Sequence, residues 1–233
     1  MGSDTKLLIF TRAPVPGLAK TRLCPPLSPT QAAAVHEASL RDVVAMTLRS
    51  TADTELRYAE SPAAADFFDR DFPHLRAAPQ SGGDLGRRMA SALDDAFGRG
   101  ADRVLILGSD APTLPDRALA EAVDRRGTVS LGPADDGGYY LVGLDRSMWP
   151  RARPMFRGIP WSTRAVLAVT RERLTRIGLR VELLRRWYDI DRIEDLRTAA
   201  DHAAPGSHLA DLLRRDEFAR LVIGSMPGTR SNA

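Results

Sequence analysis

The loop around Lys20 contains the residue types that bind phosphate groups. A short apolar run over residues 7–10 leads into a segment with Gly17, Lys20 and Arg22. Gly17 lets the backbone approach a ligand, and the two cationic side chains can neutralise phosphate oxygens. Lys20 is one of only two lysines in the chain. The segment therefore predicts a phosphate-binding loop, with a solvated basic turn as the alternative, and its spacing matches neither a Walker loop nor a dinucleotide fingerprint.

Two aspartates follow predicted strands and are suited to a divalent cation. Asp110 comes directly after the most continuous apolar run in the chain, and Asp191 lies in an acidic segment further on. Mg²⁺ prefers few carboxylates together with phosphate oxygens and water. The structural alternatives are that Asp110 caps a turn and that Asp191, with Glu194 three residues later, forms a capping box. Capping and metal binding are compatible, and Asp189 is a competing ligand.

Two further motifs are expected to contact an acceptor molecule. One combines adjacent acids and glycines after a predicted strand, and its structural alternative is a hairpin turn. The other carries hydroxyls that can cap a helix or donate to an anion. Their residues are Asp135, Asp136, Gly137 and Gly138 in the first motif and Ser162 and Thr163 in the second.

Other catalytic classes find little support. The four histidines lack metal-ligand spacing and are interpreted as structural; they are His36, His74, His202 and His208. The single cysteine, Cys24, excludes an internal disulfide and a multi-cysteine zinc site, and is expected to be a packed thiol. The Gly-x-Ser-x-Gly motif of many hydrolases is absent.

Composition indicates one globular domain that handles small ligands. The chain has 233 residues, 43% of them hydrophobic, and a net charge of +3 that is spread among 30 acidic residues. Dispersed charge and only 6% aromatic content argue against nucleic-acid binding. No apolar stretch approaches membrane-spanning length and no signal segment is evident, so a cytoplasmic protein is expected. We predict a single domain over residues 1–224 and a flexible tail over 225–233.

Alternating strand and helix patterns predict an α/β/α sandwich with a mostly parallel central sheet. Strands are expected near residues 7–10, 53–59, 75–78, 104–107, 128–131, 139–142 and 181–184. Helices are expected from Ser28, near Leu85, over 115–125, after Thr163, near Ile193 and over 209–222. Residues 28–31 predict a capping box at the start of the first of these helices. Ligands of such folds bind beyond the carboxyl ends of the strands, where each motif above falls.

Six ordered motifs between Lys6 and Ala200 resemble one family. The chain resembles the DUF2064 family, also called the rSAM/selenodomain-associated transferase 1 family, of the nucleotide-diphospho-sugar transferase (GT-A-like) superfamily. This resemblance implies the GT-A-like fold and a transferase, in a family named mostly as glycosyltransferases by genome context. The motifs are PGLAKTRL, QSGGDLGRRM, GSDAPTLP, GPADDGGYYLVG, PWST and DIDRIEDL.

A more distant similarity implies roles for individual residues. Residues 19–23 resemble phospholactate guanylyltransferases, and residues 189–196 resemble sugar-acid cytidylyltransferases. In such enzymes the first loop holds the triphosphate, a glycine-rich turn reads the base, and two aspartates hold Mg²⁺. The resemblance assigns the nucleotide to Lys20, Arg22 and the stretch from Gln80 to Arg88, which includes Gly82, Gly83 and Asp84, and the metal, Mg²⁺ or Mn²⁺, to Asp110 and Asp191. The first-loop residues Arg12, Ala13, Pro14 and Gly17 are also expected to bind the nucleotide. The motif over residues 135–138 has no match in those guanylyltransferases, so the acceptor stays open.

The leading hypothesis is a Mg²⁺-dependent nucleotidyltransferase that joins an NTP to a small phosphorylated or carboxylated acceptor and releases pyrophosphate. Lys20, Arg22 and Asp110 are its predicted catalytic residues. A glycosyltransferase that uses a nucleotide-sugar is the main alternative, but a donor with two phosphates has less use for two cations in the first loop. A non-catalytic nucleotide-binding protein is the third hypothesis. The protein is expected to bind a nucleotide and a small acceptor, with a homodimer as a possible assembly.

Overall fold

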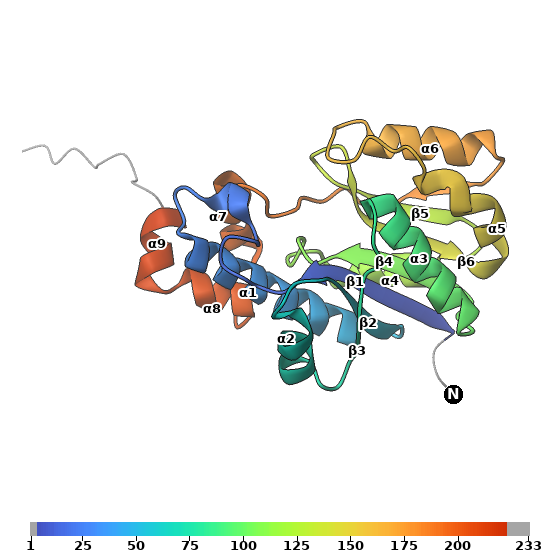
Figure 1. Ribbon diagram of the computed structural model, residues 1–233. Helices are drawn as coiled ribbons and strands as arrows, with labels where there is room; N and C mark the ends of the chain where they lie inside the picture. The colour runs from blue at the N-terminus through green and yellow to red at the C-terminus, as the bar shows by residue number, and fades with distance from the viewer. Residues whose placement is uncertain (1–3, 223–233) are drawn as a thin grey trace, which may run out of the picture.

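A seven-stranded sheet forms the centre of the computed structural model, which describes residues 4–222. Helices cover both of its faces, as Figure 1 shows. The strand order is β3-β2-β1-β4-β6-β5-β7, so the apolar strand β4 lies in the middle of the sheet, as its sequence predicts. The strands are β1 (Thr5–Arg12), β2 (Asp53–Ala59), β3 (Arg76–Pro79), β4 (Arg103–Gly108), β5 (Val129–Pro133), β6 (Tyr139–Asp145) and β7 (Val181–Leu183).

The sheet is mostly parallel, as predicted, with one reversed strand. β6 pairs antiparallel with both β4 and β5, whereas the other neighbouring strands pair in parallel. The connection between Pro133 and Tyr139 is a short turn, which can join antiparallel strands but is too short for a parallel crossover. The carboxyl ends of β1, β4 and β5 therefore meet at one edge of the sheet.

Alternation along the strands divides the core between the two faces. On β1, Leu7 and Ile9 pack with one set of helices, whereas Leu8 packs on the other side of the sheet. The first set is α1 (Pro29–Leu48), α2 (Ala64–Asp71) and α4 (Asp116–Asp124). The second set is α3 (Leu85–Gly98), α5 (Trp149–Ala152) and α6 (Val166–Arg176).

The C-terminal helices form a lobe beside the first half of α1. They are α7 (Ile193–His202), α8 (His208–Leu213) and α9 (Asp216–Val222), and Figure 1 shows them away from the sheet. A separate apolar cluster joins this lobe to Leu23, Val35 and the buried Ile190. The single helix expected over 209–222 is thus two helices, α8 and α9. The tail predicted over 225–233, like residues 223 and 224 of the predicted domain, lies outside the described residues.

Capping explains where two of the functional helices begin. Ser28 accepts a hydrogen bond from the amide of Gln31, whose side chain accepts from the Ser28 amide, so the predicted capping box is present. Asp84 likewise caps α3 by accepting from the amide of Arg87 at 2.8 Å. At α7 the expected cap is wrong, because Asp195 rather than Glu194 accepts from the preceding backbone amides.

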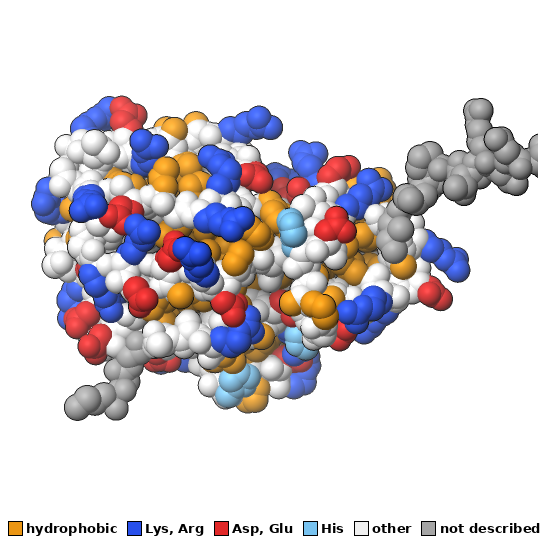
Figure 2. Space-filling model, turned by 180° about the vertical axis from the view of Figure 1, so that it is seen from behind, with side chains coloured by type: hydrophobic (Ala, Val, Ile, Leu, Met, Phe, Trp, Pro, Cys, Tyr) orange, Lys and Arg blue, Asp and Glu red, His pale blue; other side chains and the backbone are white. Residues whose placement is uncertain are grey.

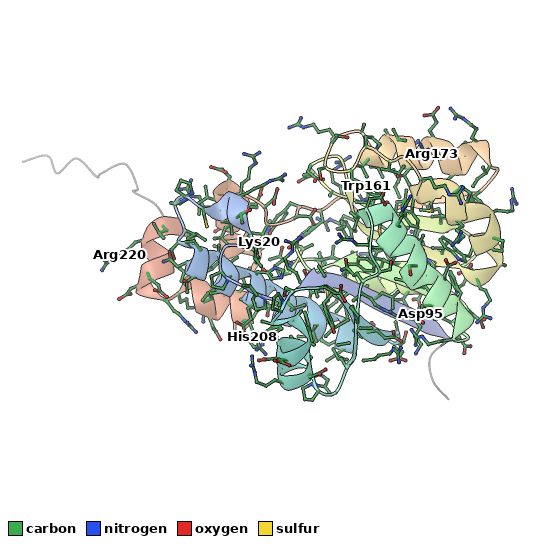
Figure 3. The ribbon with its side chains drawn as sticks, in the orientation of Figure 1. Lys20, Asp95, Trp161, Arg173, His208 and Arg220 are labelled. Carbon is green, nitrogen blue, oxygen red and sulfur yellow. The ribbon has the colours of Figure 1, made fainter. Side chains whose placement is uncertain are left out.

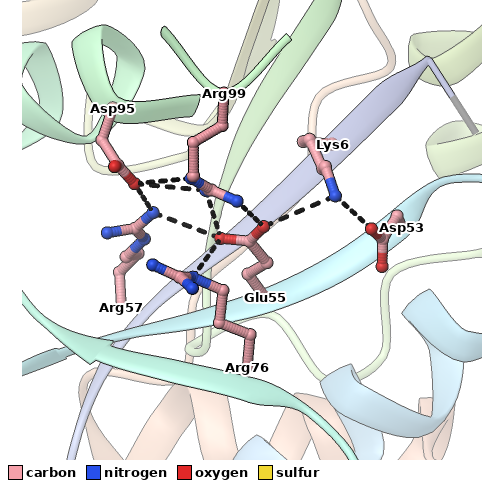
Figure 4. Close-up of polar contacts among 7 residues, drawn as sticks. All are labelled: Lys6, Asp53, Glu55, Arg57, Arg76, Asp95 and Arg99. Atoms are coloured by element: carbon pink, nitrogen blue, oxygen red, sulfur yellow. Dashed lines mark hydrogen bonds and ion pairs between the residues drawn. The ribbon is translucent and has the colours of Figure 1, made fainter. Parts of the chain in front are cut away.

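The face of β2 toward α3 is charged instead of apolar. Glu55 is 2% exposed and forms ion pairs with Lys6, Arg57, Arg76 and Arg99, as Figure 4 shows. Because each buried charge needs partners, this network replaces hydrophobic packing at the side of the sheet where α3 ends.

Among residues 4–222, no helix is long and apolar enough to cross a membrane.

Candidate active site

A cleft of about 680 Å³ opens at the carboxyl edge of the sheet. Its lining comes from the end of β1, the segment between β7 and α7, the β5–β6 turn, the start of α3 and the loop before α6. Parallel α/β sheets bind ligands at this edge. Its lining includes the predicted site residues Arg12, Arg22, Asp110, Asp135, Asp136, Gly138, Ser162, Thr163 and Asp191.

Lys20 does not line the cleft, and its buried ammonium contacts Asp110 and Ile190. Its ammonium is 2.6 Å from Oδ1 of Asp110 and also donates to the carbonyl of Ile190, and its side chain is only 5% exposed. The backbone of Lys20 is left-handed, at φ 50°, which is uncommon for a residue other than glycine. The ammonium thus joins the first loop, the end of β4 and the segment before α7.

Asp110 sits at this junction with half of its side chain exposed to the cleft. Partial burial acts to raise the pKa of its carboxyl, but the groups around it, with the charge of Lys20 as the largest contribution, together outweigh burial and hold that pKa below the ordinary value. Asp110 is therefore ionised at neutral pH. Its carbonyl also accepts a hydrogen bond from the Ile190 amide at 2.8 Å, which fixes the two segments to each other.

His36 is a neighbour of this carboxylate that sequence analysis treated as structural. It is buried in α1, its Nε2 lies 3.0 Å from the carbonyl of Arg12, and its Nδ1 lies 3.9 Å from Oδ1 of Asp110. Burial lowers the pKa of His36, so the ring is neutral and Nε2 carries the proton donated to that carbonyl. His36 has no sequence motif because the packing of α1 on the sheet creates this contact.

The segment between β7 and α7 brings two more carboxylates to the cleft. Asp191 forms an ion pair with Arg22, and both side chains are about half exposed. Burial first, and then the charges of Asp110 and Asp136, raise the pKa of Asp189 to about 7. Asp110, Asp136 and Asp191 thus line the same cleft as Asp189 and disfavour its charge.

This donor set fits a Mg²⁺ ion that shares its coordination with a ligand. Within the described residues, no group of three or more His, Cys, Asp or Glu side chains is arranged to hold a metal alone. Mg²⁺ is commonly held by one or two carboxylates plus phosphate oxygens and water. Half-exposed oxygens of Asp110 and Asp191 suit that arrangement, and like-charge crowding favours a cation between them.

The turn over residues 135–138 is the hairpin that sequence analysis gave as the structural alternative, and Asp135, Asp136 and Gly138 also line the cleft, while contact with an acceptor stays a prediction. Oδ1 of Asp136 accepts from the Gly138 amide at 2.8 Å, and the exposed Asp135 faces Arg186. Gly137 has φ +90°, and a Cβ there would lie 2.4–2.7 Å from the backbone of Arg164. Glycine is thus required where this turn packs on the loop before α6.

The loop before α6 brings Ser162 and Thr163 to the lining of the cleft. The helix begins at Val166, later than the predicted caps, and Thr163 accepts from the Ala165 amide in the preceding turn. Ser162 has a left-handed backbone, at φ 64°. Figure 3 labels Trp161, which precedes Ser162 in this loop, and Lys20, which lies near α1.

The glycine-rich turn before α3 has its polar groups committed to the fold. The side-chain amide of Gln80 donates to the carbonyls of Thr11 and Arg57. Asp84 caps α3, and the Arg88 side chain donates to the Gly83 carbonyl. The predicted base-reading residues Gln80, Gly82, Gly83, Asp84 and Arg88 do not line the cleft, and neither do Ala13, Pro14 and Gly17 of the first loop. Leu85 and Met89, at the start of α3, do line the cleft.

The first loop nevertheless approaches the cleft through its cationic side chains. Arg12 lines the cleft and donates to the Leu18 carbonyl at 2.8 Å, which ties the end of β1 to the loop. Gly17 is left-handed, at φ +79°, with open space beside it. On the face shown in Figure 2, basic side chains are spread among acidic and apolar side chains.

A family model matches residues 42–163, a segment that contains Asp110 and the hairpin turn. The family is described as "Uncharacterized protein conserved in bacteria (DUF2064)". No curated protein matches the chain significantly. The match therefore groups the chain with proteins whose description states no activity.

Solved structures share the fold at two levels of similarity. A "putative nucleotide-diphospho-sugar transferase" from Desulfovibrio desulfuricans G20 is 32% identical over 95% of this chain and 97% of its own, with a TM-score of 0.88. A 4-diphosphocytidyl-2C-methyl-D-erythritol synthase is 14% identical over 84% and 95%, at 0.55. A cytidylyltransferase from Leptospira borgpetersenii is 13% identical over 96% and 98%, at 0.54. The latter two show the fold alone.

Proposed function

The chain belongs to the DUF2064 family, and from this premise we propose that it is a Mg²⁺-dependent nucleotidyltransferase. The observation that carries the proposal is the junction of Lys20, Asp110 and Ile190 beneath a cleft lined by further aspartates and by arginines, among them Arg12 and Arg22. Carboxylates for a metal and cations for phosphates, on one edge of a mostly parallel sheet, suit transfer to or from a nucleotide. The named transferases of the same fold support this reading.

The reaction needs positioning and charge neutralisation more than proton transfer. An acceptor phosphate or carboxylate oxygen attacks the α-phosphorus of an NTP, the bond to the β-phosphate oxygen breaks, and pyrophosphate leaves. Such an oxygen is already anionic at neutral pH, so no general base is required. Mg²⁺ on Asp110 and Asp191 would supply charge neutralisation at the phosphates.

Three side chains of the first loop have distinct roles in this proposal. Lys20 keeps the Asp110 carboxylate ionised and fixed against the segment before α7. Arg12 and Arg22 line the cleft and are available to the phosphates of the nucleotide. Arg22 would exchange its exposed ion pair with Asp191 for a phosphate oxygen, which costs little because such surface pairs contribute little.

A glycosyltransferase is the second candidate, and one observation favours it. The 32% identical structure is named for nucleotide-diphospho-sugar transfer. The buried Lys20 also reduces the number of first-loop cations that directly face the cleft, which weakens the preference for a triphosphate drawn from sequence. In this candidate Asp110 and the metal would hold the diphosphate.

Product analysis separates the two candidates. The protein is incubated with Mg²⁺, each of the four NTPs and a panel of organic phosphates and carboxylates, and pyrophosphate is measured. Parallel reactions contain nucleotide-sugars and are assayed for free nucleoside diphosphate. The proposal expects acceptor-dependent pyrophosphate release that is lost in Asp110→Asn. Nucleoside diphosphate release from a nucleotide-sugar, with no pyrophosphate from any NTP, would replace it with glycosyl transfer.

A further inference from the structure

The cleft has an apolar wall that the proposed chemistry does not use. It consists of Leu85, Met89, Tyr139 and Trp161, all of which line the cleft. Leu85 is 43% exposed, one of few large apolar side chains in the described chain with so much exposure. An exposed leucine inside a concave site is more informative than one on an open surface, because contact with a ligand would bury it.

This wall is rigidly built. A Cβ on Gly86 would lie 3.0 Å from Cζ2 of Trp161 and 2.5 Å from the Phe156 carbonyl, so glycine at this position allows the indole to pack against α3. The ring of Tyr139 meets the indole edge to face, with centroids 6.4 Å apart. Gly86, at the start of α3, therefore leaves the space in which Trp161 packs.

Two features at the wall point to an occupant. The indole N–H of Trp161 is buried and has no hydrogen-bond partner within the described chain, which is unusual for a buried donor. Arg164, three residues further along the same loop, lines the cleft and has no carboxylate within 4.0 Å among residues 4–222. Its backbone is held by close packing against Gly137. An unpaired cation beside an apolar wall complements an anion carried on an apolar body.

We propose that this wall and Arg164 form the acceptor subsite, and that the acceptor is an organic phosphate or carboxylate with an apolar, preferably aromatic, body. The inference rests on the proposed function, because it assigns the wall to the acceptor rather than to the nucleotide. The apolar body lies against Leu85 and Trp161, and Arg164 binds the anionic group. This assignment uses none of the aspartates, so they stay available for the metal and the nucleotide.

The test compares two organic phosphates that differ mainly in their carbon body. Phenyl phosphate and glycerol 3-phosphate are titrated into the protein by calorimetry with Mg²⁺ and without any nucleotide. We expect phenyl phosphate to bind about tenfold more tightly, because its ring buries apolar surface. Leu85→Ser should reduce that ratio at least about threefold, and Leu183→Ser, which changes a leucine of similar exposure outside the cleft, should not.

Arg164→Gln should weaken both probes to a similar extent, since it removes the charge and leaves the wall intact. Equal affinity for the two probes, an unchanged ratio in Leu85→Ser, or full affinity in Arg164→Gln would overturn the proposal. Because no nucleotide is present, these results do not depend on whether nucleotidyl transfer occurs. The pyrophosphate assay tests nucleotidyl transfer separately, so either experiment can fail without the other.

Discussion

The Lys20 ammonium lies 2.6 Å from Oδ1 of Asp110, and it is almost completely buried beneath a carboxylate that is half exposed. The pair connects the loop after β1 to the end of β4. Only the carboxylate reaches the cleft directly, so Lys20 affects ligands through Asp110 and the Ile190 carbonyl. Its position between three segments distinguishes it from Arg12 and Arg22, which line the cleft themselves.

Lys20→Met tests this connection with a side chain of similar length and no charge. Asp110 loses the cation that holds its pKa down, and the Ile190 carbonyl loses a donor. We expect turnover to fall by two or more orders of magnitude, comparable to the loss of a preorganised electrostatic donor. The loss of turnover is measured from rates of pyrophosphate release. Lys6→Met, which makes the same substitution at the other lysine of the chain, is the control. Turnover equal to wild type would exclude the role.

Gly137→Ala should destabilise the fold through the contact between the hairpin turn and the loop before α6. The added Cβ would meet the Arg164 backbone at 2.4–2.7 Å. Gly127→Ala is the matched control, because Gly127 also has a positive φ but open space beside it. Urea unfolding should show a loss of about 1–2 kcal/mol for the control from the left-handed backbone, and about 1–3 kcal/mol more for Gly137→Ala. Equal losses would argue against the contact.

Asp95 should contribute to stability in a pH-dependent way through the charged network shown in Figure 4. Partial burial acts to raise the pKa of Asp95, but hydrogen bonds from Arg57 and Arg99 outweigh it and hold that pKa below its ordinary value of 3.8. A carboxyl whose pKa is lowered on folding stabilises the protein above the unfolded pKa, and this contribution is lost as pH falls through the folded pKa.

The free energy of unfolding of the wild type should therefore fall more steeply below pH 4 than that of Asp95→Asn. Because the Asp95 side chain is 38% exposed, solvent screening limits the difference to about 1 kcal/mol or less. Denaturant unfolding between pH 6 and pH 2 measures it, with Asp124→Asn as a control at an exposed position. Parallel curves for wild type and Asp95→Asn would contradict the assignment.

Local patterns in the sequence were sufficient to predict the sheet, its central strand and the edge at which the motifs meet. Buried strands and capping residues are set by neighbours in the chain, so periodicity and the Ser28 capping box were informative. The reversal of β6 also has a local signal, the short link between Pro133 and Tyr139. The hairpin turn that the sequence offers for residues 135–138 implies the antiparallel pairing of β5 and β6.

The features that sequence analysis missed depend on contacts between distant segments. His36 approaches Asp110 only because α1 packs across the sheet, and Trp161 reaches α3 only because Gly86 leaves space for it. Burial of Lys20 likewise depends on the segment before α7, which is 170 residues away from it in the chain. Such contacts leave no spacing pattern that a single sequence could show.

The proposed activity is tested most directly by calorimetric binding of Mg²⁺ complexes of the four NTPs and of nucleotide-sugars to the wild type and to Asp110→Asn. We expect that one NTP binds more tightly than any nucleotide-sugar, that its affinity falls at least about tenfold without Mg²⁺, and that Asp110→Asn removes this metal dependence. Tighter binding of a nucleotide-sugar, or NTP binding that is unaffected by Mg²⁺ and by the Asp110 substitution, would contradict it.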